Sequence, residues 1–348
     1  MQYWKLQNAD GKKWIIPTKD VSTALGIYQP SSWKGKLLKR ILPLFGTIRR
    51  LYSPFPQVDL PLDGDIIKHL ENVFHGHKLE YSLFLGTPSV YQKTVIQIFE
   101  GHRILGYAKI TEKESICQLF DQEETMLRKL KEKGIGNIPK CLFNQKIKGN
   151  RQLFVMTTEK DARSIILHSW GRWHEEFISM IQDKTRHRMM FGNSDYAKLL
   201  NELCLRKDSL PAEAKDTVIA TIDIIRRRYH YEENDMVVMH GDFTPWNMFR
   251  QNDHLFVFDW EYAMESCPAG LDKCHFLIQS AIFEKHLSAE EIVDSMIDSE
   301  MGQTNKETLT MYLLAIIAIY VCREEEGRVC ENIGVYVELL KQLNERYK

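Results

Sequence analysis

The stretch VVMHGDFTPWNMFR, residues 237 to 250, sets polar side chains directly after a run of apolar ones. The apolar residues lead into a His-Gly-Asp triplet that ends at Asp242, and Asn247 follows five positions later. A second apolar run at 255 to 258 ends at another acid, Asp259. Both runs are typical of short strands, and catalytic side chains are often carried on loops that a rigid scaffold supports. The pattern therefore places two carboxylates and one amide at the ends of two predicted strands.

These residue types suit a site that binds a metal ion and phosphate. Carboxylate and amide oxygens are ligands that suit Mg²⁺ better than thiols or imidazoles. Phosphoryl transfer requires a protein mainly to position two substrates and to neutralise oxygen charge through such an ion. In this interpretation Asn247 and Asp259 hold the metal. His240 supports the loop. In the alternative interpretation this is a turn in which Asp242 and Asn247 cap backbone amides. The second strand ending in an acid favours the site.

Composition narrows the class of protein. The 348 residues are 44% hydrophobic and 27% charged, as in folded proteins, and a formal net charge of -1 gives no reason to expect nucleic-acid binding. The first residues carry no apolar signal segment, and the longest apolar run, 311 to 322, is too short to span a bilayer. Seven cysteines without a C-x-x-C pair indicate reduced thiols. We expect a cytoplasmic protein.

The character of the chain changes near residue 160. Before it we predict strands at 81–86, 93–100, 103–110, 140–144 and 151–159, with one helix at 115–133 that Gly134 closes. After it we predict helices at 172–189, 195–205, 211–230, 289–299, 305–324 and 330–346, with only the two short runs around Asp242 and Asp259 as strands. A small antiparallel-sheet lobe followed by a larger helical lobe is an α+β arrangement.

One lysine and one glutamate in the first lobe form a predicted pair. Lys109 lies on the strand 103–110, on the same face as two large apolar residues. Glu123 falls in the middle of the apolar stripe of the helix 115–133, where an unpaired carboxylate is costly. We therefore predict that Lys109 contacts Glu123. The alternative is that both lie on unrelated solvated faces.

The motif around Asp242 resembles that of a known family. Protein kinases write this loop H-R-D-x-x-x-x-N and follow it with D-F-G. HGDFTPWN keeps the His, Asp and Asn spacing with Gly241 in place of Arg, and FDWE supplies the second acid. This loop, with the downstream DWEYA…PAGLDKCHF at 259–276, resembles the aminoglycoside phosphotransferase and choline kinase family. The resemblance implies a two-lobed protein-kinase-like fold and an ATP- and Mg²⁺-dependent phosphotransferase. In this role Asp242 is the catalytic residue, which accepts the proton of the acceptor hydroxyl.

The resemblance covers the loop strongly and roughly residues 80–280 loosely, and we expect three parts in the chain. Residues 1–75 form an N-terminal extension packed on the small lobe, 76–159 the nucleotide-binding lobe, and 160–348 the large lobe with the catalytic loop and acceptor site. Lys109, paired with Glu123, is aimed at the α- and β-phosphates. A phosphate-covering loop is expected at 85–93, but it lacks the glycine-rich pattern. Gly86 and Ser89 either contact phosphate there or belong to a plain hairpin turn.

The resemblance implies a small hydroxylated acceptor: a sugar, an amino sugar, an amino alcohol or an aminoglycoside. No A-P-E follows Asp259, although protein kinases end their peptide-docking segment with it. Glu261 is the predicted acceptor contact, whereas Asp272 is predicted to cap a helix beginning near Leu271. Two rival functions remain, a catalytically inactive kinase-like binding module and a protein kinase.

The segment 31–52 is basic and amphipathic. Such a segment can touch an anionic membrane surface or a phosphorylated partner. Pro43 interrupts it, and packing on the small lobe is the favoured interpretation.

Overall fold

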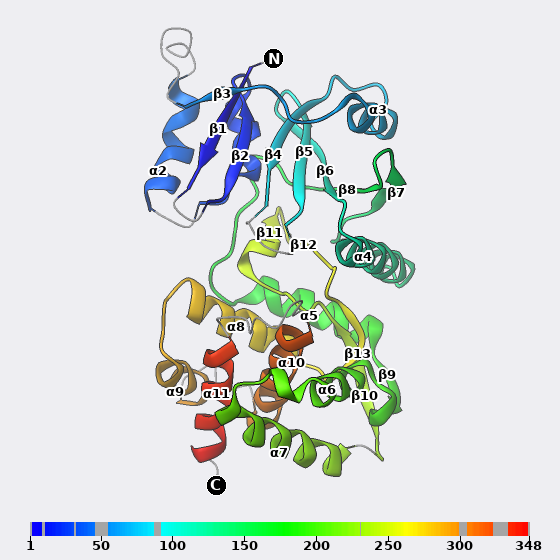
Figure 1. Ribbon diagram of the computed structural model, residues 1–348, viewed down its shortest axis with the longest axis vertical. Helices are drawn as coiled ribbons and strands as arrows, with labels where there is room; N and C mark the ends of the chain where they lie inside the picture. Colours follow the sequence, from blue (N-terminus) through cyan, green and yellow to red (C-terminus); the bar gives the residue numbers. More distant parts are fainter. Residues whose placement is uncertain are drawn as a thin grey trace. The chain divides into compact units, whose positions relative to one another are not determined.

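The computed structural model describes residues 2–8, 11–30, 33–45, 55–86, 92–229, 231–298, 305–322 and 333–346. The chain divides into two compact units (Figure 1). Unit 1 comprises residues 1–132 and 136–165. Unit 2 comprises residues 133–135 and 166–348.

Unit 1 is built on an eight-stranded sheet in the order β3-β1-β2-β4-β5-β6-β8-β7, with every neighbouring pair antiparallel. The strands are β1 (Tyr3–Gln7), β2 (Lys13–Pro17), β3 (Gln57–Val58), β4 (Glu80–Phe84), β5 (Thr94–Glu100), β6 (Arg103–Thr111), β7 (Cys141–Ile147) and β8 (Arg151–Thr157). The strands β4 to β8 confirm the runs predicted between 81 and 159. Strands β1 and β2 pair with each other and continue the same sheet, since β2 pairs with β4.

The helices of unit 1 are α1 (Val21–Ala24), α2 (Trp33–Ile41), α3 (Gly64–Val73) and α4 (Glu114–Glu132). Successive side chains of β2 point to opposite faces of the sheet. Ile15 therefore lies in an apolar cluster with residues of α3, whereas its neighbours Trp14 and Ile16 lie in a second cluster with residues of α1. Helix α3 was absent from the prediction. It begins where the side chain of Asp63 accepts the backbone N–H groups of Asp65 and Ile66.

Helix α4 confirms the helix predicted at 115–133. Gly134 follows it with φ of 73°, the left-handed conformation that ends many helices. Its buried stripe includes Ile116, Phe120, Leu127 and Leu130. Glu123 is fully buried in the same stripe.

Only part of the basic segment 31–52 is described, because residues 31, 32 and 46–52 lie outside the described ranges. Within α2, Gly35 is buried and the Nζ of Lys39 donates a hydrogen bond to the carbonyl of Tyr28. Trp33 and Leu37 are exposed. One side of α2 therefore packs within unit 1, and the other faces outward.

Unit 2 is mainly helical. Its helices are α5 (Arg172–Thr185), α6 (Asp195–Leu205), α7 (Ala212–Tyr229), α8 (Leu271–Phe283), α9 (Ala289–Asp298), α10 (Lys306–Cys322) and α11 (Ile333–Arg346). Helices α6 to α11 share one apolar core, and α10 is buried along most of its length. Within the described residues, no helix combines the length and apolar character needed to cross a bilayer.

Unit 2 holds more strands than the two predicted there. They are β9 (His187–Met190), β10 (Glu233–Met239), β11 (Met248–Gln251), β12 (His254–Val257) and β13 (Met264–Cys267). Strands β13, β10 and β9 form one sheet, and β11 and β12 form a hairpin.

The prediction of one helix over 172–189 is wrong at its end. Helix α5 stops at Thr185, and the next residue, Arg186, has an extended ψ of 131°. The chain then pairs with β10, where Met190 lies opposite Glu233. This pairing is a tertiary interaction that helical periodicity cannot reveal.

Candidate active site

Four elements of unit 2 carry the loop that contains Asp242. Strand β10 ends at Met239, directly before His240, and a short 3₁₀ turn over 245–247 follows the aspartate. The hairpin β11–β12 continues the chain, and the backbone N–H of Phe258 donates to the carbonyl of Asn247 at 3.0 Å. This bond ties the end of the second predicted strand to the loop.

Gly241 occupies a position that a larger residue cannot take. Its φ is 81°, which L-residues rarely adopt. A Cβ atom there would overlap the carbonyl oxygen of Tyr262. The glycine that stands in place of the kinase arginine is therefore required by the local backbone.

His240 is a buried support of the loop. Its Nε2 lies 3.0 Å from the carbonyl oxygen of Phe258, and its Nδ1 lies 3.2 Å from the backbone N–H of Asp242. These partners assign the proton to Nε2, because Nδ1 must accept. Burial lowers the pKa of His240, which keeps the ring neutral near pH 7. The predicted supporting position of His240 agrees with this geometry.

Asp272 supports the same loop from α8. Its carboxylate accepts hydrogen bonds from the backbone N–H groups of His240 at 2.9 Å and of Gly241 at 3.3 Å. Burial raises the pKa of this carboxyl above its ordinary value. The prediction that Asp272 caps its own helix is wrong, since Gly270 stands at the cap position and no side chain bonds there.

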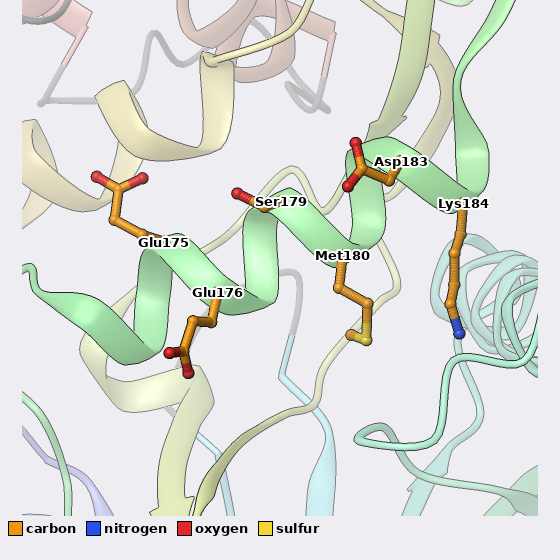
Figure 2. Close-up of a pocket in the computed structure, with 6 residues that line it drawn as sticks. All are labelled: Glu175, Glu176, Ser179, Met180, Asp183 and Lys184. Atoms are coloured by element: carbon orange, nitrogen blue, oxygen red, sulfur yellow. The ribbon is translucent and has the colours of Figure 1, made fainter.

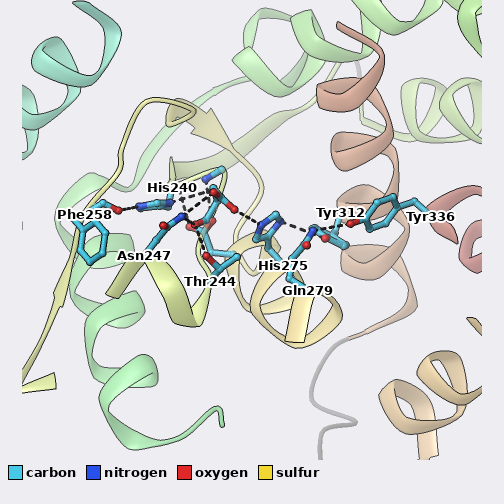
Figure 3. A network of polar contacts seen from close by, with 11 residues as sticks. His240, Thr244, Asn247, Phe258, His275, Gln279, Tyr312 and Tyr336 are labelled. Carbon is cyan, nitrogen blue, oxygen red and sulfur yellow. Dashed lines mark hydrogen bonds and ion pairs between the residues drawn. The ribbon is translucent and has the colours of Figure 1, made fainter. Parts of the chain in front are cut away.

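Asp242 is held at both carboxylate oxygens. Figure 3 shows the two residues that hold it, Asn247 and His275. The Nδ2 of Asn247 donates to its Oδ2 at 2.8 Å and to its backbone carbonyl at 3.0 Å. The Nε2 of His275 lies 3.1 Å from its Oδ1. The Asp242 side chain keeps 31% of its surface exposed, enough for an incoming group to reach it. The sequence interpretation did not include His275, which lies one helical turn after Asp272 on α8.

The predicted metal ligands offer hard oxygen donors. Asp259 follows β12 with φ of 69°, unusual for a residue other than glycine. Carboxylate oxygens of Asp259 and Glu261 lie within 4.8 Å of each other. Because the Nδ2 of Asn247 faces Asp242, its amide oxygen is the atom left to ligate an ion. This donor set fits Mg²⁺, which prefers oxygen ligands.

In unit 1 the structure brings Lys109 and Glu123 together. The Nζ of Lys109 lies 2.6 Å from an oxygen of Glu123, with side-chain exposures of 4% and 0%. The neighbouring Glu124 instead accepts a hydrogen bond from Asn144. The buried pair is the one that the apolar stripe of α4 indicated.

Breaking this pair from either side should destabilise the protein. Removing one partner of a buried ion pair costs about 3–5 kcal/mol, so Lys109→Met or Glu123→Leu should each lower Tm by on the order of 5–15 °C. The double variant should lose much less than the sum, because neither charge is left alone. Thermal unfolding of the four proteins measures this coupling.

The matched control is Lys146 with Glu114, which also joins a strand lysine to α4 at 3.2 Å. That pair is 54% and 68% exposed, and exposed pairs contribute little. Its cycle should therefore be nearly additive. Additive losses for Lys109 and Glu123 as well would show that their contact does not stabilise unit 1.

The predicted phosphate-covering turn is described only in part. Gly86 has φ of 75°, and a Cβ there would collide with the carbonyl of Lys93. This position therefore requires glycine. Ser89 lies outside the described residues, as do the other residues from 87 to 91.

A depression of about 550 Å³ lies along α5 and is lined by residues of that helix alone (Figure 2). Glu175, Ser179 and Asp183 form one row, and Glu176, Met180 and Lys184 form the next. The Oε1 atom of Glu175 accepts hydrogen bonds from the Nζ of Lys273 at 2.9 Å and from the Nε1 of Trp170 at 2.5 Å. The residues that line the depression include none of the predicted site residues.

Comparison with known proteins supports the resemblance that the sequence indicated. Residues 177–269 match the model of the phosphotransferase enzyme family, APH, which confirms the resemblance seen in the loop. A comparison with curated proteins found no match.

The fold prediction is confirmed by solved structures. A thermostable mutant of aminoglycoside phosphotransferase APH(4)-Ia, in ternary complex with AMP-PNP and hygromycin B, is 11% identical, with 82% of this chain and 99% of that chain covered and a TM-score of 0.56. A mutant of the same protein with ADP and hygromycin B is 11% identical, with 80% and 98% covered and a TM-score of 0.54. At this identity the likeness concerns the fold, which is α+β and protein-kinase-like.

Proposed function

We propose that this chain is an ATP:alcohol phosphotransferase that moves the γ-phosphate of ATP to a hydroxyl of a small polar metabolite. The observation that carries the proposal is the setting of Asp242. Its carboxylate is partly exposed and held at both oxygens, on a loop whose spacing matches that of kinases. A carboxylate fixed in this way is suited to orient a hydroxyl and to take its proton.

The residues of unit 2 divide the work. An oxygen of Asp242 accepts the hydrogen bond of the acceptor hydroxyl and then its proton, as the new oxygen–phosphorus bond forms and the bond to ADP breaks. Asn247 and Asp259 hold Mg²⁺, which supplies charge neutralisation for the phosphate oxygens when bound. His240 and Asp272 keep the loop in place through the hydrogen bonds described above.

In unit 1, the ammonium of Lys109 binds the α- and β-phosphates and Glu123 orients it. The 2.6 Å contact between them supports this role, because it fixes the end of a flexible side chain. The backbone of Gly86 is a further phosphate contact in this proposal, and Ser89 is another. Unit 1 is thus the nucleotide-binding part, and unit 2 the part that holds metal and acceptor.

Glu261 has two possible roles that experiment separates. We predicted that it contacts the acceptor, but its carboxylate lies within 4.8 Å of that of Asp259. Two neighbouring carboxylates attract a cation, so Glu261 is also suited to stand beside the metal. If it binds the acceptor, Glu261→Gln raises the acceptor KM and leaves the Mg²⁺ dependence unchanged. If it stands beside the metal, the Mg²⁺ dependence weakens.

The acceptor is a small molecule in this proposal, and the missing A-P-E argues against a protein substrate. A solved structure with this fold holds AMP-PNP and hygromycin B together, which supports the same class of acceptor. Sugars, amino sugars, amino alcohols and aminoglycosides share the hydroxyl that Asp242 requires.

We expect turnover of at least one small hydroxylated compound and none of generic protein substrates. The experiment offers labelled ATP and Mg²⁺ with a library of sugars, amino sugars, amino alcohols and aminoglycosides, and in parallel with protein substrates. ADP release and label transfer are measured, with Asp242→Asn as the blank. Strong labelling of proteins without turnover of any library compound would make the chain a protein kinase. ATP binding without turnover of either would make it a binding module.

A further inference from the structure

A histidine from α8 contacts the proposed base. His275 is buried, and its Nε2 lies 3.1 Å from the Oδ1 of Asp242. The other oxygen of that carboxylate is taken by Asn247. The side chain of Asp242 is therefore clamped between the loop on one side and α8 on the other.

The imidazole of His275 is itself held from behind. Its Nδ1 lies 3.3 Å from the hydroxyl of Tyr312 on α10, and Tyr312 is fully buried. Burial raises the pKa of Tyr312 well above its ordinary value, so its hydroxyl stays protonated and can donate. The carboxylate of Asp242 can only accept, so Nε2 carries an N–H that faces Asp242, and the hydroxyl of Tyr312 donates to Nδ1.

The contacts continue into the core of unit 2. Gln279, one turn after His275 on α8, donates to the hydroxyl of Tyr336 on α11 at 2.8 Å (Figure 3). Tyr312 and Tyr336 both belong to the apolar core of helices α6 to α11. The orientation of His275 is thus set by packed helices and not by a loop.

We propose that His275 is a positioning residue for Asp242, and that Tyr312 acts through it by fixing the ring. The inference rests on the proposed function, in which Asp242 takes the proton of the acceptor hydroxyl. His275 donates Nε2–H to Oδ1 and locks the rotation of the carboxylate, so that Asp242 meets the acceptor hydroxyl in one fixed orientation. The proton stays on Asp242 during transfer, and His275 keeps its own.

The test uses MgATP alone, because water replaces the acceptor hydroxyl in slow intrinsic hydrolysis. His275→Phe removes both ring nitrogens and keeps an aromatic ring, whereas His275→Gln keeps an N–H donor. Tyr312→Phe removes the hydroxyl behind the ring. Its matched control is Tyr196→Phe, another fully buried hydroxyl, which bonds the carbonyl of Met311 at 3.0 Å beside Tyr312.

Three quantities are measured for each variant: kcat for ATP hydrolysis, Kd for MgATP by calorimetry, and Tm. We expect His275→Phe to lower kcat by on the order of 10- to 100-fold, since misplaced catalytic groups lose about that much, with Kd within about twofold. His275→Gln should keep most of kcat. Tyr312→Phe should lower kcat severalfold, and Tyr196→Phe should leave kcat unchanged at a similar loss of Tm.

The outcomes separate the inference from the function on which it rests. If Asp242→Asn abolishes hydrolysis while His275→Phe and Tyr312→Phe turn over like the wild type, His275 does not position the base and the function stands. The inference would also be overturned if Tyr196→Phe and Tyr312→Phe both lost kcat in proportion to their loss of Tm. A wild-type protein that neither binds nor hydrolyses MgATP would overturn both.

Discussion

The Asp242→Asn variant is expected to lose kcat on the order of a thousandfold, while its Kd for ATP stays nearly unchanged. The amide keeps the size of the side chain, but it cannot take the proton of the acceptor. In the wild type, His275 and Asn247 both donate hydrogen bonds to the carboxylate of Asp242. In the variant, the NH₂ group of the new amide faces one of these two donors and cannot accept from it. The loss therefore falls on the chemical step and not on the nucleotide.

Steady-state turnover and calorimetric titration with ATP measure the two effects separately. The matched control is Asp253→Asn, an exposed aspartate in the turn between β11 and β12 of the same unit. That variant should behave as the wild type. If Asp242→Asn kept more than about a tenth of the wild-type kcat, another group would be the base.

The second large effect is expected from Asp259→Ala, which removes a charged ligand from the proposed metal site. ATP binding should lose its dependence on Mg²⁺, and activity should fall with it. Asn247→Ala should weaken binding less, because the amide is a neutral ligand. Its larger effect should be on kcat, since Asn247 also holds the carboxylate of Asp242.

Calorimetric titrations of ATP with and without Mg²⁺ give the metal dependence of each variant directly. Asn252→Ala, in the exposed turn after β11, serves as the control for an asparagine replaced in the same region. A full Mg²⁺ dependence retained by Asp259→Ala would remove this residue from the metal site, and Glu261 would then be the acid to test next.

Much of the site was visible in the sequence because its signals are local. Asp242 and Asn247 lie five residues apart on one loop, and Asp259 ends the next strand. Glu123 could be predicted as a paired residue because it lies inside an apolar stripe, where a lone carboxylate is unfavourable. The contact with Lys109 follows from the same argument, although the two residues belong to different elements.

The remainder depended on contacts between distant segments. His275 reaches Asp242 across 33 positions, and Tyr312 reaches His275 across another 37. Nothing in the spacing of α8 indicates that its buried face meets a loop instead of core. Asp272 was assigned to its own helix for the same reason, since a local cap is the simpler use of an acid near a helix start.

The N-terminal hairpin also has a consequence for truncation. Strand β4 is paired with β5 on one side and with β2 on the other, where the rings of Trp14 and Phe84 stack at 5.3 Å. A chain shortened to residues 76–348 would leave the peptide groups of β4 unpaired, next to apolar side chains that now lie in the core. Open strand edges of this kind recruit other chains and promote aggregation. In the full chain, the strand next to β1 at this edge of the sheet is β3, which has only two residues. So short an edge strand is a poor template for pairing with another chain.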